Sequence, residues 1–465
     1  AGRARVHLQR QRDILLRCDI GGEADKAVLG EIGLERRQFY REKRLARIRL
    51  GEALRYSVPA RSVGDALVID ASRIAMAHFR VLRDSGDSAS AVALLQSLRS
   101  NVTDPKRKME IACLLVESFA ENAWWTQSLD MLRTASEIET SDHASRAWLA
   151  WAKGQIAWYH GTYSTAELLG REAVDHMLSA DGDRTPEDDE LLAMTYMQLA
   201  HTRHGLGAYD ASFEALRAAR EVVERQKEMP ARVRVNLLFH LGGVLATRPG
   251  HARTAARYLR EACLLSARHG LARDAAGSAL NLARAYLILG EVDRALEIGR
   301  QGLATSRRVH GVAAHGWHCL SFATIELAAG NAAAAVELAR FGGSTEAHDM
   351  PRAGYAQSIE ASALLALGEP QRARTLAEGG SAVLRAHAQQ PLLGFALRVL
   401  AESAYVCGDG AAAQNASDES IELLERFGHP YSLASALRSR AAITGKTSYE
   451  RDARDLLASL RTAQP

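Results

Sequence analysis

Apolar and small residues recur along most of this 465-residue chain with the three-to-four-residue period of an amphipathic helix. Residues 281–303 show the unit clearly: a first helical stretch, NLARAYLIL, ends at Gly290, and a second stretch, EVDRALEIGRQGL, follows it. One face of this unit carries the small residues Ala283, Ala295, Gly299 and Gly302. Because small side chains let two helices approach closely, the pattern predicts a helical hairpin with a glycine turn.

The same arrangement recurs through the rest of the chain. Its predicted turns are 36 to 46 residues apart and lie at Gly86, Asn122, Gly161, Gly207, Gly250, Gly290, Gly330, Gly368, Gly408 and Gly445. Five residues after many of these turns a small residue occupies the second helix, at Ala91, Ala166, Ala255, Ala335, Ala373 and Ala413. A hairpin of this kind cannot bury its apolar stripe alone, so neighbouring hairpins are expected to stack into one continuous core.

This pattern resembles a degenerate array of tetratricopeptide repeats, with a period longer than the 34 residues of that family. The resemblance implies an all-α fold, in which about ten hairpins form a right-handed superhelical solenoid over residues 73–465. It also implies a concave groove, lined by the first helix of every hairpin, that binds a peptide, a partner helix or a small effector. The repeat supports many unrelated functions, so it predicts the fold better than the activity.

The N-terminal segment has a different pattern. Gly33 separates two short amphipathic stretches, and the apolar side chains expected to pack between them are Leu29, Ile32, Leu34 and Phe39. The string IGLERRQFYR at residues 32–41 resembles the helix-turn-helix of bacterial transcriptional regulators and of sigma-factor region 4. It departs from that motif at Glu35, which replaces the usual Ser or Thr and weakens the N-cap. We expect residues 1–56 to form this head and residues 57–72 to connect it to the solenoid.

In helix-turn-helix geometry the second helix enters the major groove of double-stranded DNA. The residues expected to read base edges are Arg36, Arg37, Gln38 and Arg41, and those expected to contact phosphates are Tyr40, Lys43, Arg44 and Arg47. The alternative interpretation is an ordinary surface helix whose arginines are solvated, with Glu42 and Glu52 as local partners. A single short recognition helix contacts few base pairs, so DNA reading would require a homodimer.

The charge distribution favours the DNA-binding interpretation. The whole chain has a net charge of +3, yet residues 1–61 carry fifteen Arg and Lys against eight Asp and Glu. The remaining residues are therefore mildly acidic. A basic head on an acidic body is typical of a nucleic-acid-binding module.

Aromatic residues are few, at 6 % of the chain, but five of the six Trp gather in residues 124–158. We expect this stretch to be an effector or partner surface formed by Trp124, Trp125, Trp148, Trp151, Trp158 and Tyr159. The alternative is that these rings fill wide gaps between helices.

No enzyme motif or cofactor fingerprint stands out. His310, His315, His318 and Cys319 lack the further ligands of a zinc site, and Gly445-Lys446-Thr447 has no preceding strand or glycine for a phosphate loop. We therefore expect no enzyme activity, no cofactor and no metal.

The chain's compartment is expected to be the cytoplasm. Five widely spaced Cys without a CxxC pair suggest a reducing environment, and no apolar run approaches the length of a membrane span.

The leading hypothesis is a homodimeric DNA-binding regulator, controlled by an effector peptide, small molecule or protein in the solenoid groove. The alternatives are a protein-interaction scaffold without specific DNA binding and an adaptor that contacts RNA polymerase.

Overall fold

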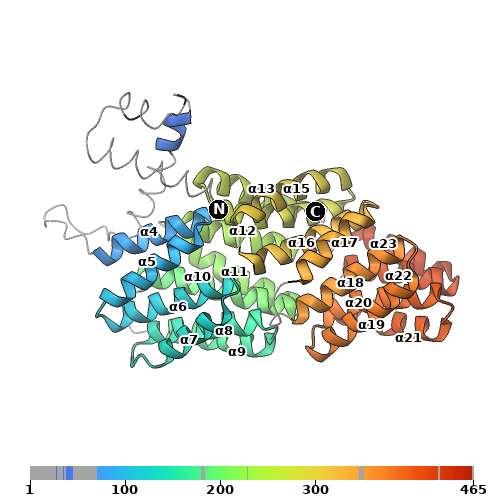
Figure 1. Ribbon diagram of the computed structural model, residues 1–465, viewed down its shortest axis with the longest axis horizontal. Helices are drawn as coiled ribbons and strands as arrows, with labels where there is room; N and C mark the ends of the chain where they lie inside the picture. Colours follow the sequence, from blue (N-terminus) through green and yellow to red (C-terminus); the bar gives the residue numbers. More distant parts are fainter. Residues whose placement is uncertain are drawn as a thin grey trace.

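The computed structural model describes residues 28, 35, 38–44, 71–179, 184–227, 229–309, 311–344, 350–427 and 430–462. The described residues of 71–462 form helices joined by turns and loops, and none of the described residues lies in a strand. The predicted all-α fold is confirmed. Figure 1 shows a long array with α4 and α5 at one end and α21 to α23 at the other.

From Ala71 onward the described residues form twenty helices that pair into ten successive hairpins, which confirms the predicted number. The hairpins are α4 (Ala71–Ser85) with α5 (Ser88–Asn101), α6 (Pro105–Glu121) with α7 (Trp125–Ser136), α8 (His143–Tyr159) with α9 (Tyr163–Leu178), α10 (Pro186–Gly205) with α11 (Tyr209–Arg225), α12 (Ala231–Ala246) with α13 (Ala252–His269), α14 (Ala272–Leu289) with α15 (Val292–Val309), α16 (Val312–Ala328) with α17 (Ala332–Gly343), α18 (Met350–Ala366) with α19 (Pro370–Ala386), α20 (Gln390–Val406) with α21 (Gly410–Arg426), and α22 (Pro430–Thr444) with α23 (Thr447–Arg461).

The hairpin turns lie where the sequence pattern places them. All nine predicted turn glycines adopt φ angles between +70° and +88°, a left-handed conformation that glycine adopts without steric cost. At the remaining turn, Asn122 has φ −96° and the left-handed residue is the next one, Ala123, at φ +60°. The glycines therefore end the first helix of nearly every hairpin.

Small residues on the second helices bring the two helices of each hairpin together, as predicted. The alanines that follow the turns are buried: Ala91, Ala166, Ala255, Ala335, Ala373 and Ala413. Gly302 shows how tight the contact is, because a Cβ atom there would lie 3.0 Å from Ala279 Cβ on the first helix of the same hairpin. A larger side chain at such a position would force the hairpin apart.

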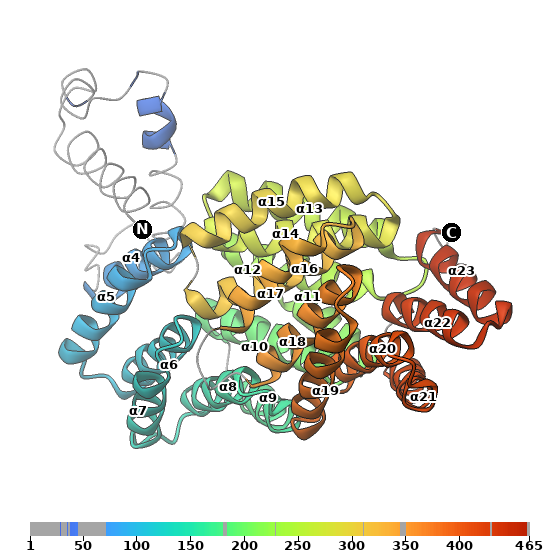
Figure 2. The same cartoon turned by 45° about the vertical axis from the view of Figure 1, so that its right-hand side comes forward.

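Early hairpins also contact late ones, which the sequence pattern does not predict. The side-chain amide of Gln389 donates a 2.9 Å hydrogen bond to the carbonyl of Gly161, across 228 residues of sequence. The backbone N–H of Gly250 donates a 2.8 Å hydrogen bond to the carbonyl of Ser459. Helix α14 touches both α4 and α23, so the solenoid returns on itself after about five hairpins. Figure 2 shows α14 and α16 in the middle of this superhelix.

The turn glycines divide into two groups according to these contacts. A Cβ on Gly86 would lie 2.7 Å from Val309 Cβ, and one on Gly207 would lie 2.8 Å from Phe427 Cβ. The later turns have open space at the same place, with no atom within 4 Å of a Cβ on Gly330, Gly368, Gly408 or Gly445. The early hairpin turns therefore form the surface that contacts residues in the second half of the array.

Ion pairs join the first helices of the early hairpins. Arg232 Nε on α12 lies 3.8 Å from Asp84 Oδ1 on α4, and Arg273 Nη1 on α14 lies 2.9 Å from Glu121 Oε2 on α6. Breaking a buried pair leaves an uncompensated charge, so these contacts hold α4, α6, α12 and α14 in one arrangement.

Asp274 lies in this cluster and predicts a pH dependence of stability. Burial raises the pKa of Asp274 to about 6, although the positive charge of Arg232 opposes the shift. Between its ordinary pKa and this raised value the Asp274 carboxyl is protonated in the folded chain and ionised in the unfolded chain. The burial of a charged Asp274 therefore destabilises the fold at pH 7.5, and this cost decreases as the pH falls to 5. Compared with Asp274→Asn, the wild-type chain should gain about 1 kcal/mol of unfolding free energy over that interval, measured by urea denaturation. The exposed Asp130→Asn should show no such gain, and an equal wild-type-to-variant difference at both pH values would contradict the prediction.

Candidate functional site

A cavity of about 1600 Å³ runs through the centre of the superhelix. Its walls are almost entirely the first helices of successive hairpins, from α8 through α10, α12, α14, α16, α18 and α20 to α22. The solenoid brings these helices to one concave face because each hairpin is rotated slightly against its neighbour. The predicted groove therefore exists as a cavity that is partly open to solvent.

One end of the cavity is aromatic. The ring of Trp158 on α8 contacts the ring of His201 on α10 in a tilted arrangement, with 4.5 Å between the ring centroids. The ring of His201 in turn lies 5.3 Å from that of His240 on α12. Burial, together with the neighbouring His201, lowers the pKa of His240 to about 3. This imidazole is neutral at physiological pH, so this end of the cavity offers flat apolar surface rather than charge.

The residues of the predicted tryptophan surface lie in three different places in the structure. Three of its members line the cavity, namely Trp125, Trp158 and Tyr159. Two others, Trp148 and Trp151, pack edge to face at 5.4 Å in the core of α8. Trp124 lies at the turn before α7, against Phe119. Only the first group is in a position to meet a ligand in the cavity.

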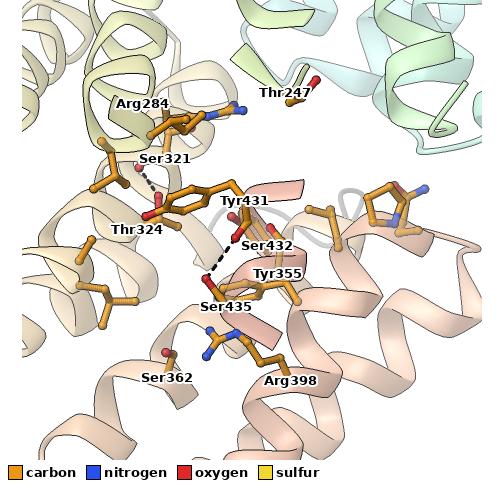
Figure 3. A pocket seen from close by; sticks show the side chains of 18 of the residues that line it. Thr247, Arg284, Ser321, Thr324, Tyr355, Ser362, Arg398, Tyr431, Ser432 and Ser435 are labelled. Carbon is orange, nitrogen blue, oxygen red and sulfur yellow. Dashed lines mark hydrogen bonds between the residues drawn. The ribbon is translucent and has the colours of Figure 1, made fainter. Parts of the chain in front are cut away.

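The middle of the cavity is polar (Figure 3). Figure 3 shows Tyr355 and Tyr431 between Arg284, above them, and Arg398, below them. Burial raises the pKa of Tyr355, and the positive charges of Arg284 and Arg398 act in the opposite direction. The tyrosine hydroxyls are thus O–H donors near two guanidinium groups.

Several polar groups of the wall satisfy one another. Arg398 Nη1 lies 2.6 Å from Glu402 Oε1 one turn along α20, and Ser439 of α22 donates a hydrogen bond to the same carboxylate. The hydroxyls of Thr324 and Ser435 each bond a carbonyl of their own helix, at 2.8 Å and 3.2 Å. These groups shape the wall without offering a free charge.

Sequence reasoning missed the central residues of the cavity, above all Arg284, Tyr355, Arg398 and Tyr431. They come from four hairpins, and their convergence depends on the pitch of the superhelix. A signal existed in the first helix of residues 281–289, where Asn281 and Arg284 interrupt an otherwise apolar stretch. Both residues line the cavity.

The histidine cluster has no metal-binding arrangement. Ser306 Oγ hydrogen-bonds to Nδ1 of His315 at 2.9 Å and to Nδ1 of His318 at 2.7 Å. No group of three His, Cys, Asp or Glu side chains among the described residues is arranged to hold a metal ion. The hydroxyl and the two imidazoles form a local hydrogen-bond network.

No described helix has both the length and the apolar character that a bilayer crossing requires.

Within the predicted DNA-binding head the structure describes residues 28, 35 and 38–44, and residues 38–44 are helical. Phe39 is buried, as expected for its core, while Arg41 and Arg44 are exposed and Tyr40 is 44 % exposed. Lys43, a predicted phosphate contact, is only 7 % exposed, and a buried ammonium group is not in a position to meet a phosphate. Gln38 is half-buried, and Arg36, Arg37 and Arg47 lie outside the described residues.

No protein-family model matches this sequence, and the search of curated proteins finds no match. Among solved structures, a Rap protein complexed with Competence and Sporulation Factor is 14 % identical, with a TM-score of 0.59 over 77 % of this chain and 98 % of that one. NprR in complex with its cognate peptide NprX is 12 % identical, with a TM-score of 0.47 over 75 % and 98 %. The apo quorum sensor NprR from B. thuringiensis is 12 % identical, with a TM-score of 0.43 over 76 % and 100 %. The chain thus shares the TPR-like helical solenoid fold of the Rap protein, at an identity that shows the fold alone.

Proposed function

We propose that this chain is a DNA-binding regulator whose superhelix holds a short peptide in its central cavity, and that the occupied cavity controls the N-terminal head. The observation that carries the proposal is the cavity itself. At about 1600 Å³ it exceeds the range of about 300–1,000 Å³ that suits drug-sized ligands, so a peptide of several residues matches it better.

The chemistry of the wall suits a peptide. Flat rings at the aromatic end offer apolar contact for side chains, and polar groups follow along the middle. The side-chain amide of Asn281 faces the cavity and has no hydrogen-bond partner among the described residues. A carboxamide donates and accepts at once, which is what a peptide group requires.

The Rap protein with the same fold was solved as a complex with Competence and Sporulation Factor. That complex supports the idea that a solenoid of this shape works with a second molecule. In this chain a ligand would shift the head's activity only by binding one superhelical pitch better than another. Such a ligand would stabilise or weaken the contacts between the early hairpin turns and the late loops.

The DNA-binding part rests on the basic charge of residues 1–61 and on the exposed Tyr40, Arg41 and Arg44 beside a buried Phe39. The test is a salt titration of the full chain with one enriched duplex and a scrambled duplex, with the enriched duplex taken from a genome-wide map of bound DNA. We expect the full chain to prefer the enriched duplex by about 10³-fold or more at physiological salt, as a dimer. Equal binding to both duplexes that disappears with modest salt would favour the scaffold interpretation instead.

A single substitution sharpens this proposal. Arg37→Ala should cost about 1–3 kcal/mol of binding and relax the preference at one base pair, because a bidentate contact to guanine would be lost. Competition binding with duplexes altered at single positions measures it. The control, Arg133→Ala on the outside of α7, should bind DNA like the wild type. Unchanged discrimination by Arg37→Ala would remove that residue from the proposed contacts.

A further inference from the structure

Positive charge dominates the cavity wall. Its lining residues include two carboxylates, Glu402 and Glu450, against five cations, Arg284, Arg398, Arg438, Lys446 and Arg461. Such an excess is unusual in a chain whose body is acidic, because Asp and Glu outnumber Lys and Arg outside the N-terminal 61 residues. A cavity whose wall carries an excess of one sign of charge attracts ligands of the opposite sign.

Arg284 differs from two other arginines that lie on first helices of the array. Arg273 pairs with Glu121 at 2.9 Å, and Arg398 pairs with Glu402 at 2.6 Å. No carboxylate of a described residue forms an ion pair with Arg284, although its side chain is half-buried and lines the cavity. Holding a guanidinium away from bulk water without a counter-charge costs free energy, which a ligand carboxylate would return.

The groups around Arg284 are donors. Tyr209 of α11 and Tyr355 of α18 both lie within its electrostatic reach, and both line the cavity. Burial raises the pKa of Tyr209 to about 12, so its hydroxyl keeps its proton at neutral pH. A guanidinium binds a carboxylate, and phenolic O–H groups of the same wall can donate further hydrogen bonds to the ligand that carries it.

We propose that Arg284 is the specificity-determining residue of the cavity and that it anchors a carboxylate of the bound peptide, either the C-terminal one or that of an Asp or Glu side chain. This inference rests on the proposed peptide-binding function and adds the chemical class of the ligand. The planar guanidinium meets a carboxylate through two parallel N–H···O bonds, a geometry that lysine does not provide. The aromatic end around Trp158 would then receive apolar side chains of the same peptide.

The test uses the immobilised full chain and four mixtures of random peptides of about six residues. The mixtures have either free or amidated C-termini, and each form is made with and without Asp and Glu. Retention is measured by mass spectrometry. We expect the mixtures that contain a carboxylate to be retained about tenfold better than the amidated mixture without Asp or Glu, because charge-assisted hydrogen bonds to Arg284 are lost in the latter. The free-acid mixture without Asp and Glu, and the amidated mixture with them, distinguish the two sources of the carboxylate.

Variants assign the effect to Arg284. Arg284→Met should abolish the preference for carboxylates, and Arg284→Lys should retain part of it. Arg133→Met, at an arginine 71 % exposed on α7, should leave it unchanged. Thermal unfolding confirms that each variant folds, and the four mixtures on the wild-type chain give an answer without any variant.

The outcomes are separable. Equal retention of all four mixtures by the wild type, or an unchanged carboxylate preference in Arg284→Met, would overturn the anchor while leaving peptide binding intact. No retention of any mixture would overturn both the anchor and the proposed peptide-binding function.

Discussion

Trp151→Ala is expected to lower the free energy of unfolding by about 3–5 kcal/mol, since it removes a large ring from the packed core of α8. Trp151 is 1 % exposed and packs edge to face on Trp148. Its indole N–H has no hydrogen-bond partner among the described residues, so the loss comes from packing rather than from a broken hydrogen bond. Urea-induced unfolding followed by circular dichroism measures it.

Trp124→Ala is the matched control from the same aromatic stretch. Trp124 is 39 % exposed at the hairpin turn, where its ring contacts Phe119. Apart from the loss of that contact, its replacement should lower the free energy of unfolding by less than about 1 kcal/mol. Similar losses for the two variants would mean that the division of the tryptophan stretch into core and surface is wrong. The pair therefore tests which of these rings stabilise the fold and which are available for another role.

Gly207→Ala is expected to destabilise the chain far more than Gly408→Ala, although both glycines end the first helix of a hairpin. Their φ angles are +75° and +85°, so alanine costs about 1–2 kcal/mol at either site. At Gly207 the new Cβ would lie 2.8 Å from Phe427 Cβ and 3.1 Å from Phe427 Cα, whereas at Gly408 nothing lies within 4 Å. Overpacking at Gly207 should add about 1–3 kcal/mol, because the backbone at Phe427 moves only with the second half of the array.

Two measurements separate the causes in this pair. Urea denaturation gives the difference in unfolding free energy, and small-angle scattering reports whether the superhelix opens. We expect the scattering of Gly207→Ala to show a larger radius of gyration than that of Gly408→Ala. Identical stability and identical radii would show that the contact between early turn and late loop does not hold the superhelix closed.

The closure contacts give the proposed regulation a physical basis. A chain of hairpins joined only to their neighbours would change pitch gradually, because each interface is soft. Here two hydrogen bonds join distant hairpins, one from Gln389 to Gly161 and one from Gly250 to Ser459. A ligand that binds across α14, α18 and α22 spans both halves of the closed superhelix, so its affinity depends on whether those bonds are made.

The structure describes only part of the predicted DNA-binding residues, whereas it describes all of the predicted effector surface. Tyr40, Arg41 and Arg44 are exposed on the described helix and remain proposed contacts. Of the tryptophan stretch, Trp125, Trp158 and Tyr159 line the cavity and remain proposed ligand contacts. The clustering of aromatic residues in sequence indicated the right hairpins, yet it could not distinguish rings that face the axis from rings that face the neighbouring helix.

Local chemistry in the sequence was sufficient to define the repeating unit. The period of apolar residues, the buried alanines five residues after many of the turns and the left-handed turn glycines all act within one hairpin or between adjacent hairpins. Each depends on interactions a few residues apart, so the helices, the turns and the number of hairpins could be predicted. Polar residues on first helices, such as Asn281 and Arg284, also carried a signal of the concave face.

Only the tertiary structure decided where the superhelix closes and what its cavity contains. Small rotations between neighbouring hairpins add up over the array, and the sequence pattern does not specify their sum. That sum brings Gly207 against Phe427, and it brings Arg284, Tyr355 and Tyr431 from three separate hairpins to one space. A guanidinium in the cavity wall that forms no ion pair with any described residue is a property of this arrangement, and no single repeat contains it.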